Sequence, residues 1–271
     1  MPTDDRVMAA AASSVHPVDV DAYIISFGGH RFEHAYALTA AFGLNATHVQ
    51  GIRTTANLTL CRQRHDLLNV TLRRDCMTCQ SGRLVAKQCY GNCEVGITDR
   101  RLHVLEGMRL AHVEAWRAIV ASGRDAIIFE DDIDAGPGSS LVDPKHGMTL
   151  QSAVDYLRHR RIQVGFVGGC AYARCCQTAM CTHALWMTPA AALAMLDYSR
   201  PCMAPDLGPS VLCATTLACR KFVTSSGQSR ELFVQDKVRF PPHHTMASVR
   251  ARRLATTERW VGSGEPLLDA V

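Results

Sequence analysis

The stretch Ala126-Ile127-Ile128-Phe129-Glu130-Asp131-Asp132 decides the fold of this chain. Its four consecutive apolar residues predict a strand buried on both faces, as in the middle of a parallel sheet. The three carboxylates that follow repel one another unless a cation or hydrogen-bond donors compensate them. Because open α/β sheets bind ligands beyond the carboxyl ends of their strands, the stretch predicts a polar ligand site there.

Strands and helices alternate around this stretch, which predicts an α/β domain with a mostly parallel sheet flanked by helices. Apolar, β-branched runs predict strands at 20–27, 47–52, 126–129, 163–167 and 184–187. Apolar residues at helical spacing predict helices at 30–42, 105–120, 150–159 and 189–196. The first strand, helix and strand predict a βαβ unit of a parallel sheet.

Length and composition fit one folded domain. The chain has 271 residues, of which 47% are hydrophobic and 20% charged, enough to bury a sizeable core. We expect a single domain over 18–245, preceded by a disordered lead-in at 1–17 and followed by a basic tail at 246–271. The net charge of +4 is too balanced for a general nucleic-acid binder, so no nucleic-acid partner is expected. The oligomeric state stays open.

The sequence contains no clear signal for the location of the protein in the cell. No run approaches the roughly 18 apolar residues that span a bilayer, so no transmembrane segment is expected, and the start of the chain is too acidic for a convincing secretory signal. Twelve cysteines and three Asn-X-Ser/Thr sites, at Asn45, Asn57 and Asn69, favour an oxidising compartment such as the ER or Golgi lumen. The localisation stays open between the secretory pathway and the cytoplasm.

Residues 53–100 interrupt the alternation and form an expected cysteine-rich insertion. Two close pairs within it have the spacing of a structural Zn²⁺ site closed by four thiolates: Cys76 with Cys79, and Cys89 with Cys93. The same spacing would serve two disulfides, which we prefer because the Asn-X-Ser/Thr sites also point to an oxidising compartment. Neither interpretation makes this cluster catalytic.

The acidic triplet at 130–132 offers hard oxygen ligands, which suit Mg²⁺ or Mn²⁺. A metal held by one or two carboxylates can take further ligands from a diphosphate and neutralise a leaving nucleoside diphosphate. The alternative is a solvated acidic loop that caps the following turn, and the residue types alone do not decide between the two.

Two adjoining blocks, 107–120 and 126–133, resemble the signature of glycosyltransferase family 25. That family includes lipopolysaccharide and procollagen galactosyltransferases. Its pattern is a glycine, then Leu-Ser-His, a Trp four residues on, and a hydrophobic strand that runs into Glu-Asp-Asp. The chain has His112 and Trp116 at the matching spacing, with Ala111 in place of the serine.

Two flanking stretches, 23–31 and 182–206, resemble other parts of the family more weakly. The resemblance implies a GT-A (Rossmann-like) fold and an inverting transfer of galactose or glucose from a UDP-sugar to a glycan or a hydroxylated protein. It also implies Mn²⁺ or Mg²⁺, with Asp131 and Asp132 at the metal. The donor contacts that it implies are Ser26, Arg31, Arg109, His112, Glu130 and Asp131.

Two of these residues also have simpler interpretations. His112 and Trp116 lie one turn apart on a helix face, and we favour the interpretation that both pack the helix against the sheet. Arg109, on a neighbouring face, could reach a phosphate or form a surface salt bridge.

An inverting transfer needs a general base near the acceptor hydroxyl. We expect Asp206 in this role, with Asp197 and Asp236 as rivals, although Asp206 could instead cap a helix. His243 and His244 could supply a late metal ligand or lie in an exposed loop, and we favour the loop.

Two other functions compete with a glycosyltransferase. A family-like domain without activity would serve as a binding module, an interpretation that Ala111 and the insertion at 53–100 support. A zinc-stabilised interaction protein would carry the acidic triplet incidentally. Turnover separates an enzyme from the first alternative, and stoichiometric Zn²⁺ without UDP affinity would favour the second.

Overall fold

The structure, a computed structural model, describes residues 17–54, 99–168, 183–200, 205, 208–209, 212–213, 216–221 and 231–235. Its strands are β1 (Asp21–Ser26), β2 (Ala46–Gln50), β3 (Ala126–Glu130), β4 (Ile133–Ala135), β5 (Val164–Gly168), β6 (Ala184–Met187), β7 (Cys219–Lys221) and β8 (Phe233–Gln235). Its helices are α2 (Gly29–Ala41), α5 (Asp99–Ser122), α6 (Leu150–His159) and α7 (Pro189–Tyr198).

Six strands form one sheet in the order β2-β1-β3-β6-β5-β7. β1 is parallel to both β2 and β3, and β5 is parallel to β7. β6 is antiparallel to both of its neighbours, so it alone in this sheet opposes the common strand direction. The predicted α/β architecture with a mostly parallel sheet is confirmed, and so is the parallel pairing of the two strands in the βαβ unit.

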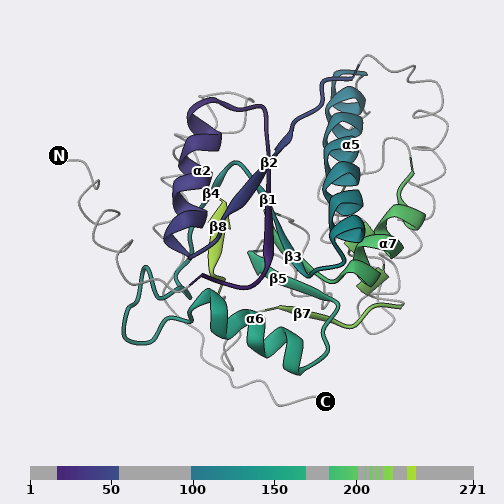
Figure 1. The fold of residues 1–271 in the computed structure, drawn as a ribbon. Helices are drawn as coiled ribbons and strands as arrows, with labels where there is room; N and C mark the ends of the chain where they lie inside the picture. Colours follow the sequence, from purple (N-terminus) through teal and green to yellow (C-terminus); the bar gives the residue numbers. More distant parts are fainter. Residues whose placement is uncertain are drawn as a thin grey trace, which may run out of the picture.

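The sheet is covered on both faces. The apolar residues of β3, at 126–129, are fully buried because their side chains alternate between two cores. Ile127 and Phe129 pack with side chains of α2 and α6, whereas Ala126 and Ile128 pack with side chains of α5 and α7. Figure 1 shows α2 and α5 on opposite sides of the sheet. The result is three layers, with β3 inside the central one.

Some elements differ from the prediction. α5 begins at Asp99, earlier than the predicted 105, and so includes the last two residues of the expected insertion. β4 and β8 were not predicted, and they pair as a separate antiparallel sheet. The edge strand β7 was also not predicted. All three strands have only three residues, too few to show a periodic pattern in the sequence.

Other expectations fall on residues that the structure does not describe. These are the lead-in up to 16, the cysteines of the insertion between 55 and 98, and the tail from 246. The described part does contain a disulfide, between Cys213 and Cys219, the first residue of β7. Such a bond is compatible with a secretory location. No helix in the described part is both long and apolar enough to cross a membrane.

Candidate functional site

A cavity of about 970 Å³ opens at the carboxyl ends of β1 and β3. The chain leaves β1 for β2 on one side, whereas β3 lies on the other side of β1, so the strand order reverses between β1 and β3. Open α/β sheets bind ligands at such a reversal. Ser26, the last residue of β1, and Glu130, the last residue of β3, both line the cavity.

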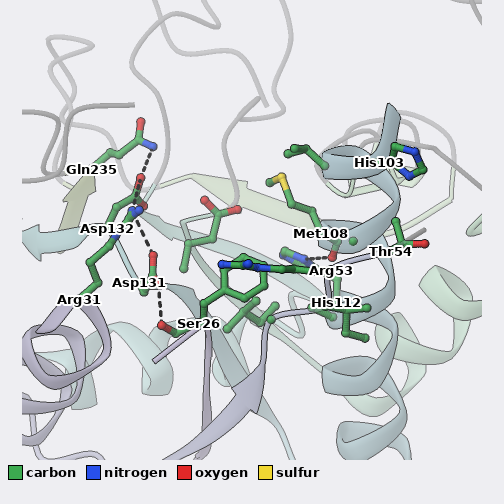
Figure 2. Close-up of a pocket in the computed structure, with 18 residues that line it drawn as sticks. Ser26, Arg31, Arg53, Thr54, His103, Met108, His112, Asp131, Asp132 and Gln235 are labelled. Atoms are coloured by element: carbon green, nitrogen blue, oxygen red, sulfur yellow. Dashed lines mark hydrogen bonds and ion pairs between the residues drawn. The ribbon is translucent and has the colours of Figure 1, made fainter. Parts of the chain in front are cut away.

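One end of the cavity is polar, and we call it the acidic corner: Ser26, Arg31, Asp131, Asp132 and Gln235 (Figure 2). The Ser26 hydroxyl donates a hydrogen bond of 2.6 Å to Oδ2 of Asp131. A guanidinium nitrogen of Arg31 lies 3.0 Å from Oδ1 of Asp131 and 3.6 Å from Oδ2 of Asp132. Arg31 therefore supplies a cation that compensates two of the three adjacent carboxylates.

Two glycines bring Arg31 to this position. Gly28, which precedes α2, and Gly29, its first residue, have φ values of 89° and 70°, a region that residues with a Cβ rarely adopt. The amide of Gly28 donates to the Ser26 hydroxyl at 2.9 Å, which leaves the Ser26 proton for Asp131. The sharp turn thus places the first turn of α2, and Arg31 with it, beside the end of β3.

The two carboxylates predicted at a metal, Asp131 and Asp132, differ in whether both of their oxygens have partners among the described residues. Both oxygens of Asp131 are engaged, by Ser26 and Arg31. Oδ2 of Asp132 accepts a hydrogen bond of 2.6 Å from Gln235, but its buried Oδ1 has no hydrogen-bond partner among the described residues. A single open carboxylate oxygen fits Mg²⁺ or Mn²⁺, which take most other ligands from water and phosphate.

The described residues contain no group of three or more His, Cys, Asp or Glu side chains that could hold a metal ion by themselves. A metal at Asp132 would therefore depend on oxygens from a ligand as well as from the protein. The geometry favours Asp132 over Asp131 as the metal ligand, and it gives Asp131 the role of holding Ser26 and Arg31.

The opposite end of the cavity is a wall of α5, and we call it the helix wall: Gly107, Met108, Ala111 and His112. A Cβ on Gly107 would lie 2.2 Å from the backbone oxygen of Ile52, so the missing side chain lets α5 approach the segment after β2. This contact gives a physical reason for glycine at the start of the 107–120 block. Ala111, which stands where the family pattern has serine, is buried in the same wall.

His112 is only 2% exposed. Its Nδ1 lies 3.0 Å from the carbonyl oxygen of Met108 and must donate there, because a carbonyl can only accept. Nε2 then carries a lone pair, and it has no hydrogen-bond partner among the described residues. Burial lowers the pKa of His112 to about 4, so the ring is neutral at pH 7.

The expected packing of His112 beside Trp116 is present, with 5.9 Å between the ring centroids and Trp116 fully buried. His112 also lines the cavity, so packing does not account for all of its surroundings. Figure 2 draws its ring on the α5 side of the cavity.

Arg109 is not among the residues that line the cavity. Its guanidinium bonds to both carboxylate oxygens of Glu106 and to the hydroxyl of Ser199 at 3.2 Å. Both Arg109 and Glu106 are largely buried, so the pair ties α5 to the end of α7. The structure therefore places Arg109 in the salt-bridging arrangement that the sequence left open, away from the other predicted donor contacts.

None of the remaining predicted residues lies at the cavity in the described part of the structure. Asp197 is exposed on α7 and is not part of the lining. Outside the described residues lie Asp206, Asp236, His243, His244 and the four insertion cysteines Cys76, Cys79, Cys89 and Cys93.

The lining also contains residues that were not predicted, among them Gln235, Phe27 and Arg53. Gln235 reaches Asp132 from β8, 103 residues further along the chain, and no local pattern marks it. Phe27 is 58% exposed, and the Arg53 guanidinium lies 5.4 Å from its ring centroid. The sequence placed Phe27 at the end of the predicted strand 20–27, and this was the one visible signal for this part of the site.

No protein-family model matches the chain, and the curated proteins include no significant match to it. The functional argument therefore depends on the geometry of the cavity and on the residues themselves.

Proposed function

We propose that the chain is a metal-dependent, inverting glycosyltransferase of the GT-A type. It would transfer galactose or glucose from a UDP-sugar to a hydroxyl group of a glycan or a hydroxylated protein side chain. The observation that carries this proposal is the acidic corner: Ser26, Arg31, Asp131 and Asp132 meet in one large cavity at the strand-order reversal. The resemblance of 107–133 to glycosyltransferase family 25 supports the same assignment.

The chemistry divides between a metal and the chain. When bound, Mn²⁺ or Mg²⁺ offsets the negative charge that builds on the departing UDP. Asp132 would hold this ion through Oδ1, the open oxygen. Arg31 adds a fixed positive charge beside it, and Asp131 keeps that guanidinium and the Ser26 hydroxyl in place. Such preorganised charge acts mainly in the transition state.

The base that deprotonates the acceptor hydroxyl stays a proposal from the sequence. Asp206 keeps this assignment, although it lies outside the described residues. Glu130 also lines the cavity and is the third carboxylate of the triplet. The variants Asp206→Asn and Glu130→Gln should therefore be compared. The general base is the residue whose substitution lowers turnover and leaves UDP affinity unchanged.

One observation favours a second candidate, a binding module without activity. Arg31 already bridges Asp131 and Asp132, so the two charges are compensated in part without a metal ion. A protein of this kind would bind a nucleotide without needing a divalent cation. The same experiment distinguishes it from the enzyme.

Calorimetry of UDP binding, with and without Mn²⁺, tests the proposal on the wild type and on Asp132→Asn. We expect Mn²⁺ to tighten UDP binding at least tenfold, and we expect Asp132→Asn to abolish that gain. Asp155→Asn is the matched control, because Asp155 is an exposed carboxylate on α6 and lies outside the cavity. Release of UDP from UDP-galactose or UDP-glucose then tests turnover.

Each outcome separates the candidates. Mn²⁺-independent UDP binding without turnover would favour the inactive binding module. Folded wild type that binds stoichiometric Zn²⁺ and no UDP would favour the zinc-stabilised interaction protein.

A further inference from the structure

The helix wall contains a buried acceptor that neither the metal nor the acidic corner uses. His112 donates through Nδ1 to its own helix, so its tautomer is fixed and Nε2 can only accept a hydrogen bond. Nε2 is buried and has no hydrogen-bond partner among the described residues. A buried polar atom of this kind is costly unless a ligand satisfies it.

The surroundings of His112 select the kind of ligand group. The nearby lining residues are mostly apolar: Ile25, Ile52, Met108 and Ala111. The Arg53 guanidinium over the Phe27 ring, both of which also line the cavity, adds a flat surface. Apolar walls with one fixed acceptor suit a planar heterocycle that carries a ring N–H, since its faces need no hydrogen bonds and its edge needs one acceptor.

The acidic corner determines which way a nucleotide would lie. Phosphates belong near Arg31 and the open oxygen of Asp132, because these sites offer positive charge directly or through a metal. The base must then lie toward the opposite end of the same cavity, which is the helix wall. This step rests on the proposed function, because it takes the ligand to be a nucleoside diphosphate sugar.

We propose that His112 is a specificity-determining residue whose Nε2 accepts a hydrogen bond from the ring N–H of the donor's base. Uracil carries this hydrogen on N3, whereas N3 of cytosine carries a lone pair that would face the lone pair of Nε2. The site therefore takes a uridine nucleotide and disfavours the cytidine nucleotide of the same charge and size. Neutrality of the ring supports this role, since a protonated imidazole would donate instead of accept.

The test compares UDP and CDP binding by calorimetry in the presence of Mn²⁺. One unpaired buried acceptor predicts that wild type prefers UDP by roughly 10- to 100-fold. His112→Phe removes the acceptor and keeps a ring, so the preference should fall to within about threefold. His112→Gln is a second variant, whose amide can turn to donate or accept, and it should also lose the preference. The comparison variant is His103→Phe, because His103 lines the same cavity from the same helix and its Nδ1 is also buried without a hydrogen-bond partner among the described residues.

The outcomes separate this inference from the proposed function. Equal affinity of wild type for UDP and CDP would overturn the role of His112 while leaving the glycosyltransferase proposal intact. So would a preference for UDP that survives in folded His112→Phe and His112→Gln, or one that disappears in His103→Phe instead. Binding of neither nucleotide by folded wild type would overturn the proposed function, and this inference with it.

Discussion

The acidic corner and the helix wall face each other across one cavity, but different forces hold them. The corner is tied together by charged and polar side chains from β1, α2, the end of β3 and β8. The wall depends on close backbone packing at Gly107 and on the burial of Ala111 and the neutral His112. Changes of charge should therefore act on the corner, and changes of volume or protonation on the wall.

The two ends also share a feature. Each contains a buried polar atom without a partner among the described residues, Oδ1 of Asp132 at the corner and Nε2 of His112 at the wall. Both atoms are acceptors at neutral pH, so a ligand that satisfies them must bring a cation or a hydrogen-bond donor to the corner and a hydrogen-bond donor to the wall. A metal-bound nucleotide meets both needs.

The largest expected effect on stability is at the wall. Gly107→Ala lies inside a helix, where alanine normally stabilises by about 1 kcal/mol. Here the new Cβ would meet the Ile52 oxygen at 2.2 Å, so α5 must move away and the substitution should instead cost about 3 kcal/mol. Urea unfolding measures the change. Arg117→Ala, at an exposed position on the same helix, should stay within about 0.5 kcal/mol.

A Gly107→Ala protein that is as stable as wild type would contradict the close approach of α5 to the segment after β2. The position of the helix wall would then depend on side-chain packing alone.

The second prediction uses protonation of the wall. Burial lowers the pKa of His112 from 6.5 to about 4, so between these values the unfolded chain binds a proton that the folded protein does not. Stability should fall as the pH falls through this window, by up to about 3 kcal/mol below pH 4. His112→Gln lacks the titrating ring, so the difference in unfolding free energy between wild type and variant isolates its share. A difference that stays constant from pH 7 to pH 4 would show that the ring titrates alike in both states.

The third prediction separates the two neighbouring carboxylates of the corner. Asp131→Asn loses the charge that holds Arg31 and weakens the bond from Ser26, which should cost about 2 kcal/mol. Asp132→Asn relieves repulsion from Asp131 and keeps an acceptor for Gln235, so its effect should stay within about 1 kcal/mol. Metal-dependent UDP binding should show the reverse order, with the larger loss in Asp132→Asn. Equal effects of both variants on both measurements would remove the distinction between a positioning residue and a metal ligand.

The sequence predicted the central elements because each has a clear period or a continuous apolar run. The stretch at 126–132 placed a doubly buried strand and its carboxylates correctly, and the βαβ unit before it is parallel as expected. The three-residue strands could not be predicted, since β7 and β8 form only through pairing with strands far along the chain.

The candidate site was predictable where a residue follows a strand end, and not where tertiary contact alone brings it in. Asp131 and Asp132 belong to the first kind, and Gln235 to the second, because a glutamine in a short strand carries no chemical signal of its own. For Arg109, the sequence contained a signal that the prediction did not use. Glu106 lies three residues earlier on the same helix, the spacing at which opposite charges pair.

The smallest predicted effect tests whether the corner works as one unit. Ser26→Ala removes a hydroxyl that donates to Asp131 and accepts from the amide of Gly28, and it should cost about 1 kcal/mol. In the double variant with Asp131→Asn, the two costs should sum to more than the measured loss by roughly 0.5 to 1 kcal/mol, since both remove the same hydrogen bond. Strict additivity would mean that Ser26 and Asp131 act independently, and the corner would then be a set of separate contacts around Arg31. A measurable coupling would instead mean that the turn at Gly28 and the end of β3 are held together before any ligand arrives, as a preorganised phosphate site requires.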